Sequence, residues 1–542
     1  MLIVVNKKLG NVLADGAVKI SFQSDYIEDD VFCSKSGIGI ECPASCPKSI
    51  GDLMSPRKTN ESNGNWKILA ILASVAMMVM FIEIMLVPAL PSIGVDFNNF
   101  QWIPWVLSVY LLVGAVATPL AGRLGDMYGK KKVLIYVMCI YVVGLLGSGF
   151  SLDISRMLFG EPSIFVLLFF RGVQGIGMGM FPLAFAIIRD TFPRDKIPTA
   201  IGTVSAMFSV GVSLGLLGGG YITSVGHWYD AFHVVTPFFV ALTILTIFLI
   251  KDPVVVKRGS LDISGATTLG IGVFSLLLGL TQGHEWGWGS PTIVALFVLA
   301  LGMFAIFTML ELRTKDPVVR LSMFRNRGVL DASISAIFIG MCMFLLFQTL
   351  PFFLETPKQA GGLFGITDTF VIGLYMFPSA IAQLIFGPMG GVLSRRVGAD
   401  KVLIAGLAIM TLGFATLVFM HSDWVGIVIS IFIAGAGMAL CMVSMINLVV
   451  VTCKQSEFGV ASGMNTLFRV VGGSVGPVLA VVILSDYTQI VMGHAVYTES
   501  GYVTTWIFGA LLSLIGLFCA IILRPKKGDM ECDMAQEDLP PS

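Results

Sequence analysis

Long apolar segments separated by short polar loops dominate the chain from about residue 66 onward. A helix crosses a bilayer when about 20 consecutive residues are mostly apolar. By that measure the sequence predicts fourteen membrane spans, and we expect an all-α integral membrane protein. The predicted spans are residues 67–90, 104–124, 132–152, 163–190, 199–224, 231–250, 262–281, 291–312, 328–353, 368–394, 401–420, 424–450, 459–485 and 503–523.

The amino-acid composition also indicates an integral membrane protein. Of the 542 residues, 56% are hydrophobic and 13% are charged, whereas soluble domains carry about 25% charged residues. The formal net charge is zero, which gives no reason to expect a nucleic-acid partner. The nine cysteines do not follow a zinc-binding spacing. The five histidines are predicted to be isolated near the outer loops, so we expect no metal or other cofactor.

The distribution of Lys and Arg predicts the orientation. Beyond residue 67, loops after odd-numbered spans contain only two basic residues, Arg156 and Lys358, and nearly all the others lie near the opposite ends of the spans. Cytoplasmic loops carry the excess of Lys and Arg. Both termini are therefore expected in the cytoplasm, and the protein in the cell membrane.

A short charged loop occurs twice. It follows the second span at residues 122–134 and returns in weaker form after the tenth span at residues 391–403. One loop duplicated at matching places in two apolar halves is typical of transporters built from repeats. The residues shared by the two copies are Gly122, Leu124, Gly129, Lys132, Val133 and Leu134, matched by Gly391, Leu393, Gly398, Lys401, Val402 and Leu403.

This loop resembles the one between helices 2 and 3 of the major facilitator superfamily. Span 4 carries the R-x-x-Q-G pattern of that superfamily at Arg171, Gln174 and Gly175. Span 5 resembles the antiporter glycine pattern at every glycine, but Leu216 stands where the pattern has proline. Residues 261–327 look like the two additional helices of the 14-span drug:proton antiporters. The glycines of span 5 are Gly202, Gly211, Gly215, Gly219 and Gly220.

The resemblance extends over residues 66–523 and implies a major facilitator fold of two six-helix bundles plus two extra central helices. The expected parts are a cytoplasmic tail at 1–65, bundles at 66–250 and 328–523, the extra pair at 251–327, and a cytoplasmic tail at 524–542. Residues 1–53 are expected to be dispensable or upstream of the native start, because Met54 precedes the first span closely.

Three charged residues lie deep in the predicted spans. Glu83 in span 1 is a candidate proton site, because an intramembrane charge needs a partner or water. Arg171, with Gln174, is a candidate relay to that carboxylate, and Arg469 in span 13 is a further cavity candidate. The alternatives are structural pairing or a position close to the outer surface for Glu83, and helix-pinning hydrogen bonds for the arginines. The neutral polar residues Gln348, Gln383 and Asn447 could contact substrate or link helices.

The first copy of the loop is a candidate gate. Gly129 would permit its tight turn, and Asp126 would reach the N-terminus of the next helix or a basic residue of the other half. The alternative is a topology signal alone. The span 5 glycines are candidate hinge residues, with ordinary small-residue packing as the alternative. The residues assigned to the gating loop are Gly122, Asp126, Gly129, Lys130 and Lys131.

These features predict a secondary transporter that exports small amphipathic or cationic compounds by proton antiport. The expected partners are the small-molecule substrate, protons and the bilayer, and one chain is expected to suffice. A uniporter or symporter for a metabolite, and a non-transporting sensor, remain alternatives. The sequence contains no Walker loop, H-E-x-x-H motif or nucleophile elbow, so we do not expect an enzyme.

Overall fold

The structure is a computed structural model. It describes residues 18–21, 30–36, 39–41, 62–98, 102–193, 195–250, 262–314, 319, 321–358, 362–366, 368–453, 457–491 and 494–525. The chain divides into two units, residues 1–64 with 538–542 and residues 65–537. The described part of the first unit contains three antiparallel strands in the order β1 (Val18–Ser21), β2 (Asp30–Ser36) and β3 (Gly39–Glu41).

Within the described residues, fourteen helical segments are long and apolar enough to cross a membrane, as predicted. The first half contains α2 (Ser62–Ile84), α3 (Leu90–Asp96), α4 (Ile103–Tyr128), α5 (Lys130–Gly149), α6 (Ser151–Phe159), α7 (Ile164–Gly175), α8 (Met180–Thr191), α9 (Ile197–Val225) and α10 (Trp228–Leu249). Then follow α11 (Ile263–Trp286), α12 (Pro291–Glu311), α13 (Arg327–Glu355), α14 (Thr369–Val397), α15 (Ala399–Met420), α16 (Trp424–Thr452), α17 (Phe458–Ser485) and α18 (Glu499–Leu523).

Two spans are interrupted where the sequence weakens α-helical hydrogen bonding. After α2 the chain makes a 3₁₀ turn at Val87–Ala89 and resumes as α3. Pro88 lacks an N–H donor, which accounts for the break. Span 4 consists of α7 and α8 joined by a 3₁₀ turn at Ile176–Gly179, whose two glycines weaken the α-helix. By contrast α9 is continuous, and Leu216 lies inside it without a kinking proline.

Two elements at the end opposite the duplicated loops were not predicted. The short helix α6 follows α5 directly. A hairpin of β4 (Thr488–Val491) and β5 (His494–Tyr497) precedes α18. Neither element is long enough to be recognised from the sequence as a membrane span.

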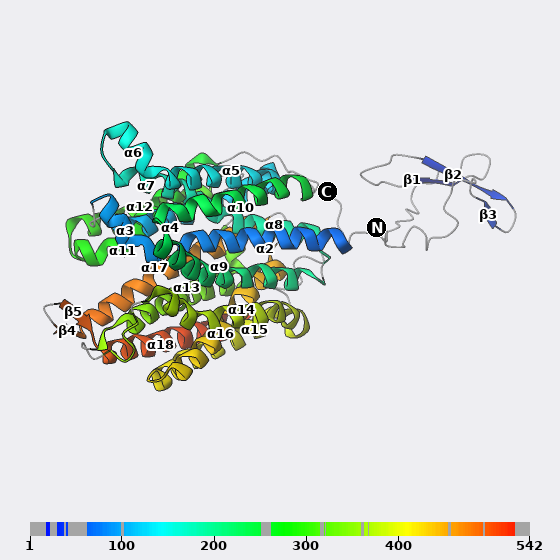
Figure 1. Cartoon of the computed structure of the whole chain (residues 1–542). Helices are drawn as coiled ribbons and strands as arrows, with labels where there is room; N and C mark the ends of the chain where they lie inside the picture. The colour runs from blue at the N-terminus through cyan, green and yellow to red at the C-terminus, as the bar shows by residue number, and fades with distance from the viewer. Residues whose placement is uncertain are drawn as a thin grey trace. The chain divides into compact units, whose positions relative to one another are not determined.

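The first-half helices, blue through cyan to green in Figure 1, lie mostly above the second-half helices, which run from yellow-green to red. The halves pack against each other chiefly through α9 with α14 and α4 with α17. The additional helices α11 and α12 pack on each other, and α11 also contacts α4 and α17. Only 17% of the most apolar stretch of α12 is buried, the smallest buried share among the fourteen spans of the described residues. The inserted pair therefore lies at the edge of the junction between the halves.

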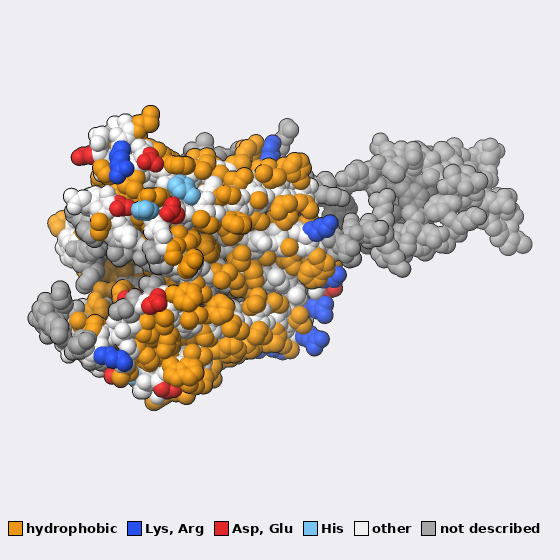
Figure 2. All heavy atoms as spheres, viewed as in Figure 1, with side chains coloured by type: hydrophobic (Ala, Val, Ile, Leu, Met, Phe, Trp, Pro, Cys, Tyr) orange, Lys and Arg blue, Asp and Glu red, His pale blue; other side chains and the backbone are white. Residues whose placement is uncertain are grey.

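Apolar side chains form a broad band over the face drawn in Figure 2, while Lys, Arg, Asp and Glu lie toward the two ends of the helices. Exposed Phe169, Phe248, Leu301, Phe419 and Phe518 belong to the spans. A soluble protein rarely exposes so large a continuous apolar surface, whereas lipid requires it. The protein is a multi-pass membrane protein.

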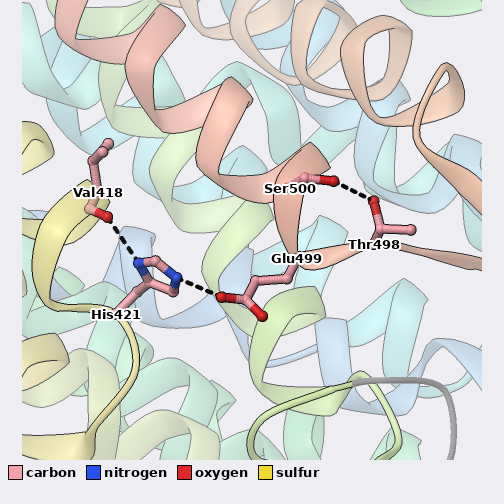
Figure 3. Close-up of polar contacts among 5 residues, drawn as sticks. All are labelled: Val418, His421, Thr498, Glu499 and Ser500. Carbon is pink, nitrogen blue, oxygen red and sulfur yellow. Dashed lines mark hydrogen bonds and ion pairs between the residues drawn. The ribbon is translucent and has the colours of Figure 1, made fainter.

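His421 is not isolated, contrary to the expectation from the sequence. Figure 3 shows its imidazole between two elements: Nε2 lies 2.8 Å from Glu499 Oε1, and Nδ1 lies 2.9 Å from the Val418 carbonyl. These contacts join the end of α15 to the first residue of α18. His227 likewise has an acidic neighbour, since its Nδ1 lies 3.7 Å from Asp230. The sequence could not reveal the first contact because its partners are 78 residues apart.

Asp262 caps the start of α11. Its carboxylate accepts hydrogen bonds from the Gly265 N–H at 2.9 Å and from the Ser264 hydroxyl at 2.6 Å. Burial acts to raise the pKa of Asp262, but these hydrogen bonds more than offset it and hold that pKa below its ordinary value of 3.8. The ionised Asp262 carboxylate thus stabilises the start of α11.

Candidate functional site: a buried carboxylate and the closed loop end

The duplicated loops adopt the same turn. Gly129 separates α4 from α5 with φ 99°, and Gly398 separates α14 from α15 with φ 103°. A side chain at these φ values would be strained, so glycine is required for the tight reversal. The predicted turn at Gly129 is confirmed in both copies.

Asp126 lies at the N-terminus of α17, in the other half of the molecule. Its carboxylate accepts a hydrogen bond from the backbone N–H of Val460. A Cβ built on Gly459 would lie 2.6 Å from both carboxylate oxygens, and one on Gly122 would lie 2.2 Å from the Gly459 carbonyl oxygen. A carboxylate is stabilised at a helix N-terminus by the unpaired N–H groups and the dipole. The helix terminus that Asp126 contacts is therefore that of α17 in the other half, whereas the sequence suggested the next helix or a basic residue.

Arg189 adds further contacts between the halves at this end. Arg189 Nη2 donates to the Val450 and Cys453 carbonyls at 3.1 and 2.8 Å, and its guanidinium lies 4.6 Å from the Phe458 ring. Arg189 was not among the predicted site residues, although a basic residue at the loop-side end of span 4 was a usable signal. These contacts, with those of Asp126, hold the two halves together at the end of the molecule that carries the duplicated loops, which we call the loop end.

Three other basic residues of this end, all in the two duplicated loops, have different contacts. Lys130 does not reach the second half: its Nζ lies 2.5 Å from Asp190 of the same half. Lys131 is half-buried and has no ion pair within the described parts of the chain. In the second copy, Arg395 Nη1 does cross to the first half, lying 3.8 Å from Asp195 Oδ2 and donating to the Asp195 carbonyl at 3.2 Å.

Glu83 is placed in the last turn of α2 and is 5% exposed. Its Oε2 has no hydrogen-bond partner among the residues that the structure describes. The charges that act on its carboxylate come from Arg171 in the first half and Arg469 in the second. The structure therefore brings together the three charged residues that the sequence had placed in three separate spans.

Arg171 is fully buried and fixed within the first half. Its Nε donates to the Val106 carbonyl at 3.0 Å and its Nη1 to Gln174 Oε1 at 2.5 Å. Gln174 Nε2 donates in turn to the Gly144 carbonyl at 3.0 Å and to Ser148 Oγ at 3.1 Å. This network joins α7 to α4 and α5, so the helix-pinning alternative holds for part of the side chain. Arg171 Nη2 remains without a partner in the described structure.

Arg469 is held differently. Its guanidinium carbon lies 5.5 Å from the centre of the Phe208 ring on α9. A cation over an aromatic face is attracted by about 0.5–2 kcal/mol. Arg469 therefore interacts with the first half through both a ring and the Glu83 carboxylate.

Tyr110 and Tyr141 belong to the same cluster and were missed from sequence. Both are fully buried, and the electrostatic environment of each includes Glu83 and Arg171. The Arg171 guanidinium lies 4.8 Å from the Tyr110 ring centre. Phenol groups in the interior of apolar spans were the signal that could have identified them.

The candidate hinge glycines are positions of close helix approach. A Cβ on Gly202 would lie 2.3 Å from the Gly387 carbonyl oxygen of α14, across the junction of the halves. On Gly211, Gly215 and Gly219 it would lie 2.1–2.6 Å from carbonyl oxygens of α2 and of Met85, the residue directly after α2. Gly220 is buried next to them. This geometry is that of small-residue packing, and a hinge role for these residues stays a prediction.

Among the described residues, no group of three or more His, Cys, Asp or Glu side chains is arranged to hold a metal ion. The model for the Major Facilitator Superfamily matches residues 72–377 and 332–536. The chain belongs to the Major Facilitator Superfamily. It is accordingly a transporter and not an enzyme.

Superfamily members with assigned names are similar over most of their length. The multidrug transporter protein MdtP of Bacillus subtilis is 28% identical over 392 residues, 72% of this chain and 69% of MdtP. The multidrug resistance protein Stp of Mycobacterium tuberculosis is 28% identical over 419 residues, 76% of this chain and 74% of Stp. The tetracenomycin C resistance and export protein of Streptomyces glaucescens is 26% identical over 431 residues, 78% of this chain and 76% of that protein.

A solved structure shares the fold. The human organic anion transporter MFSD10 superposes with a TM-score of 0.57 at 14% sequence identity, covering 84% of this chain and 99% of MFSD10. The family match, the named relatives and this fold together place the chain with the multidrug efflux type of major facilitator transporters.

Proposed function

We propose that the protein exports small amphipathic or cationic compounds across the cytoplasmic membrane in exchange for protons. The names of the relatives support the substrate class, since they include multidrug transport and drug resistance. The Glu83 cluster supports the coupling. It combines a buried acid with two cations from different halves, and Glu83 Oε2 and Arg171 Nη2 are among its atoms that have no hydrogen-bond partner in the described structure.

The observation that carries the proposal is that charges from both halves, those of Arg171 and Arg469, act on the buried Glu83 carboxylate. An ionised Glu83 attracts a guanidinium from each half, and a protonated Glu83 does not. Because charge interactions are strong where water is excluded, proton binding changes the relative energy of arrangements that bring the halves together or apart. A rearrangement of the halves changes proton affinity by the same coupling.

The cycle follows from this coupling. With the loop end closed, Glu83 takes up a proton from the opposite side and substrate leaves on that side. Neutralisation of Glu83 then permits the loop end to open. Opening breaks the contacts of Asp126 with α17 and of Arg189 with the end of α16. Proton release to the cytoplasm restores the ionised acid, which attracts a cationic substrate.

We propose the same orientation and organisation as the sequence predicts. Both termini lie in the cytoplasm, because the Lys- and Arg-rich loops mark that side. Residues 66–250 and 328–523 form the two moving bundles, and 251–327 is an inserted pair. A single chain supplies both bundles and the complete Glu83 cluster, so a monomer suffices for transport.

The test is flux of a fluorescent cation in proteoliposomes under an imposed pH gradient. Wild type should accumulate or expel the cation according to the gradient, and Glu83→Gln should lose this dependence. Glu161→Gln, an exposed acid beyond α6, is the matched control and should behave as wild type. Wild-type flux that ignores the gradient would favour a uniporter, cation movement in the direction of the proton would favour a symporter, and no flux of any tested compound would favour the sensor.

A further inference from the structure

We propose that Asn447, Asn465 and Ser205 form a hydrogen-bonding subsite for a neutral polar group of the transported molecule, occupied when the loop end opens. The inference rests on the proposed function, because it assigns part of the substrate path. It adds to the charge-based cluster at Glu83 a second element of recognition that involves no ionised group.

The three side chains are buried but incompletely paired. Asn447 and Ser205 are each 2% exposed and Asn465 is fully buried. Within the described structure, both polar atoms of Asn447, the Oδ1 of Asn465 and the Oγ of Ser205 have no hydrogen-bond partner. Folded proteins leave few buried polar atoms unpaired, and such atoms call for an explanation. Four of them on three neighbouring helices point to a ligand.

Two of the residues lie on facing helices. Arg469 of α17 covers the Phe208 ring of α9 at 5.5 Å. Asn465 precedes Arg469 by one helical turn and Ser205 precedes Phe208 by almost one, so each shares a face with its neighbour. Both helices begin at the loop end. Asn465 and Ser205 therefore lie on the loop-end side of the arginine–phenylalanine contact.

Asn447 lies at a similar depth on α16, which contacts both α9 and α17. From the helix ends at the loop side, Asn447 is about 8 Å deep, Asn465 about 10 Å and Ser205 about 12 Å, at 1.5 Å per residue. The three side chains thus form a polar layer where helices of both halves meet.

This layer lies directly inside the closure. Val450, whose carbonyl accepts from Arg189, follows Asn447 by three residues on the same face of α16. The N-terminus of α17, where Asp126 binds, is less than two turns from Asn465. Separating the halves at this end therefore exposes the unpaired polar atoms together with Asp126 and Arg189.

The chemistry indicates what the layer recognises. Asn447 presents an amide NH2 donor group and a carbonyl acceptor, Asn465 presents a carbonyl acceptor, and Ser205 presents a hydroxyl that serves as either donor or acceptor. This set complements a carboxamide or a hydroxyl group and offers no charge. Helix linking alone does not account for it, because Asn465 already links α17 to α13 through Nδ2 and the Ala332 carbonyl at 2.8 Å, which leaves its Oδ1 unused.

The experiment compares two aromatic cations that differ only in a carboxamide, 1-benzyl-3-carbamoylpyridinium and 1-benzylpyridinium. Their affinities for purified wild type, Asn447→Leu and Ser205→Ala are measured by thermal shift. Wild type should bind the carbamoyl probe about 5- to 25-fold more tightly, since one or two hydrogen bonds contribute roughly fivefold each. Both variants should reduce this ratio and bind 1-benzylpyridinium as wild type does.

Ser444→Ala is the matched control. Ser444 is fully buried on the same helix, but its hydroxyl already donates to the Leu440 and Cys441 carbonyls at 2.6 and 3.2 Å. It should keep the wild-type ratio. Without ligand, Asn447→Leu should melt no lower than wild type, because the substitution removes unpaired buried atoms.

The outcomes separate the two proposals. Equal binding of both probes by wild type, an unchanged ratio in both variants, or a marked loss of melting temperature in Asn447→Leu each overturns the subsite while leaving proton-coupled export intact. Failure of wild type to bind either cation overturns the proposed substrate class, and the subsite with it.

Discussion

Gly122→Ala should shift the molecule toward the state that is open at the loop end. The substitution adds one methyl group to α4 at a point where α4 meets α17 of the other half. The new Cβ would lie 2.2 Å from the Gly459 carbonyl oxygen and 2.7 Å from its carbon. Both contacts are to backbone, which cannot turn away as a side chain can, so relief requires that the helices separate.

The magnitude follows from the cost of overpacking. An extra methylene in a well-packed core costs about 1–3 kcal/mol. Here that cost applies only to the closed state, because the contact crosses between the halves. It should therefore raise the ratio of open to closed molecules by about 5- to 150-fold.

Cys453 provides the assay. It is 4% exposed at the end of α16, and its carbonyl accepts a hydrogen bond from Arg189 across the closure. In a protein that retains Cys453 as its only cysteine, opening of the loop end should expose the thiol to a polar maleimide. The rate of labelling should rise in Gly122→Ala in proportion to the open population.

Gly125→Ala is the control on the same helix. Its Cβ would lie 2.4 Å from Leu183 Cδ2, a side-chain atom of the same half. This substitution should lower the melting temperature without increasing labelling of Cys453. If Gly122→Ala labels at the wild-type rate, or both variants label alike, the closure does not depend on the contact between Gly122 and Gly459.

Three further predictions concern other contacts. Gly129→Val should destabilise the protein by about 1–3 kcal/mol in thermal melting, since φ 99° strains any side chain, whereas Gly302→Val, with open space around Gly302, should not. Arg189→Gln should increase labelling of Cys453 several-fold, because it removes charged hydrogen bonds across the closure; unchanged labelling would contradict this. Asp262→Ala should cost about 1 kcal/mol near neutral pH. The folded-state pKa of Asp262 is depressed, so its stabilisation is present above 3.8 and declines as pH falls through the lower folded value; a difference between wild type and variant that persists in strong acid would contradict the assignment.

The sequence by itself determined the features that depend on local chain chemistry. Apolar segments of span length predicted the fourteen helices because an unpaired backbone is excluded from lipid. The glycine of the duplicated loop predicted its turn because only a residue without Cβ tolerates the required φ. The rarity of charges in the spans identified Glu83, Arg171 and Arg469 as unusual, since each is expensive in a membrane.

Tertiary structure decided which of these residues meet. Glu83 and Arg469 are separated by nearly the whole membrane domain in sequence, and only the packing of the two halves brings their charges together. The same packing gave Asp126 a helix terminus and His421 a glutamate, and left Asn447 without a hydrogen-bond partner among the residues that the structure describes. Contacts between distant segments depend on helix orientation and mutual fit, which the apolar pattern does not specify, because every lipid-facing or core-facing helix satisfies that pattern equally well.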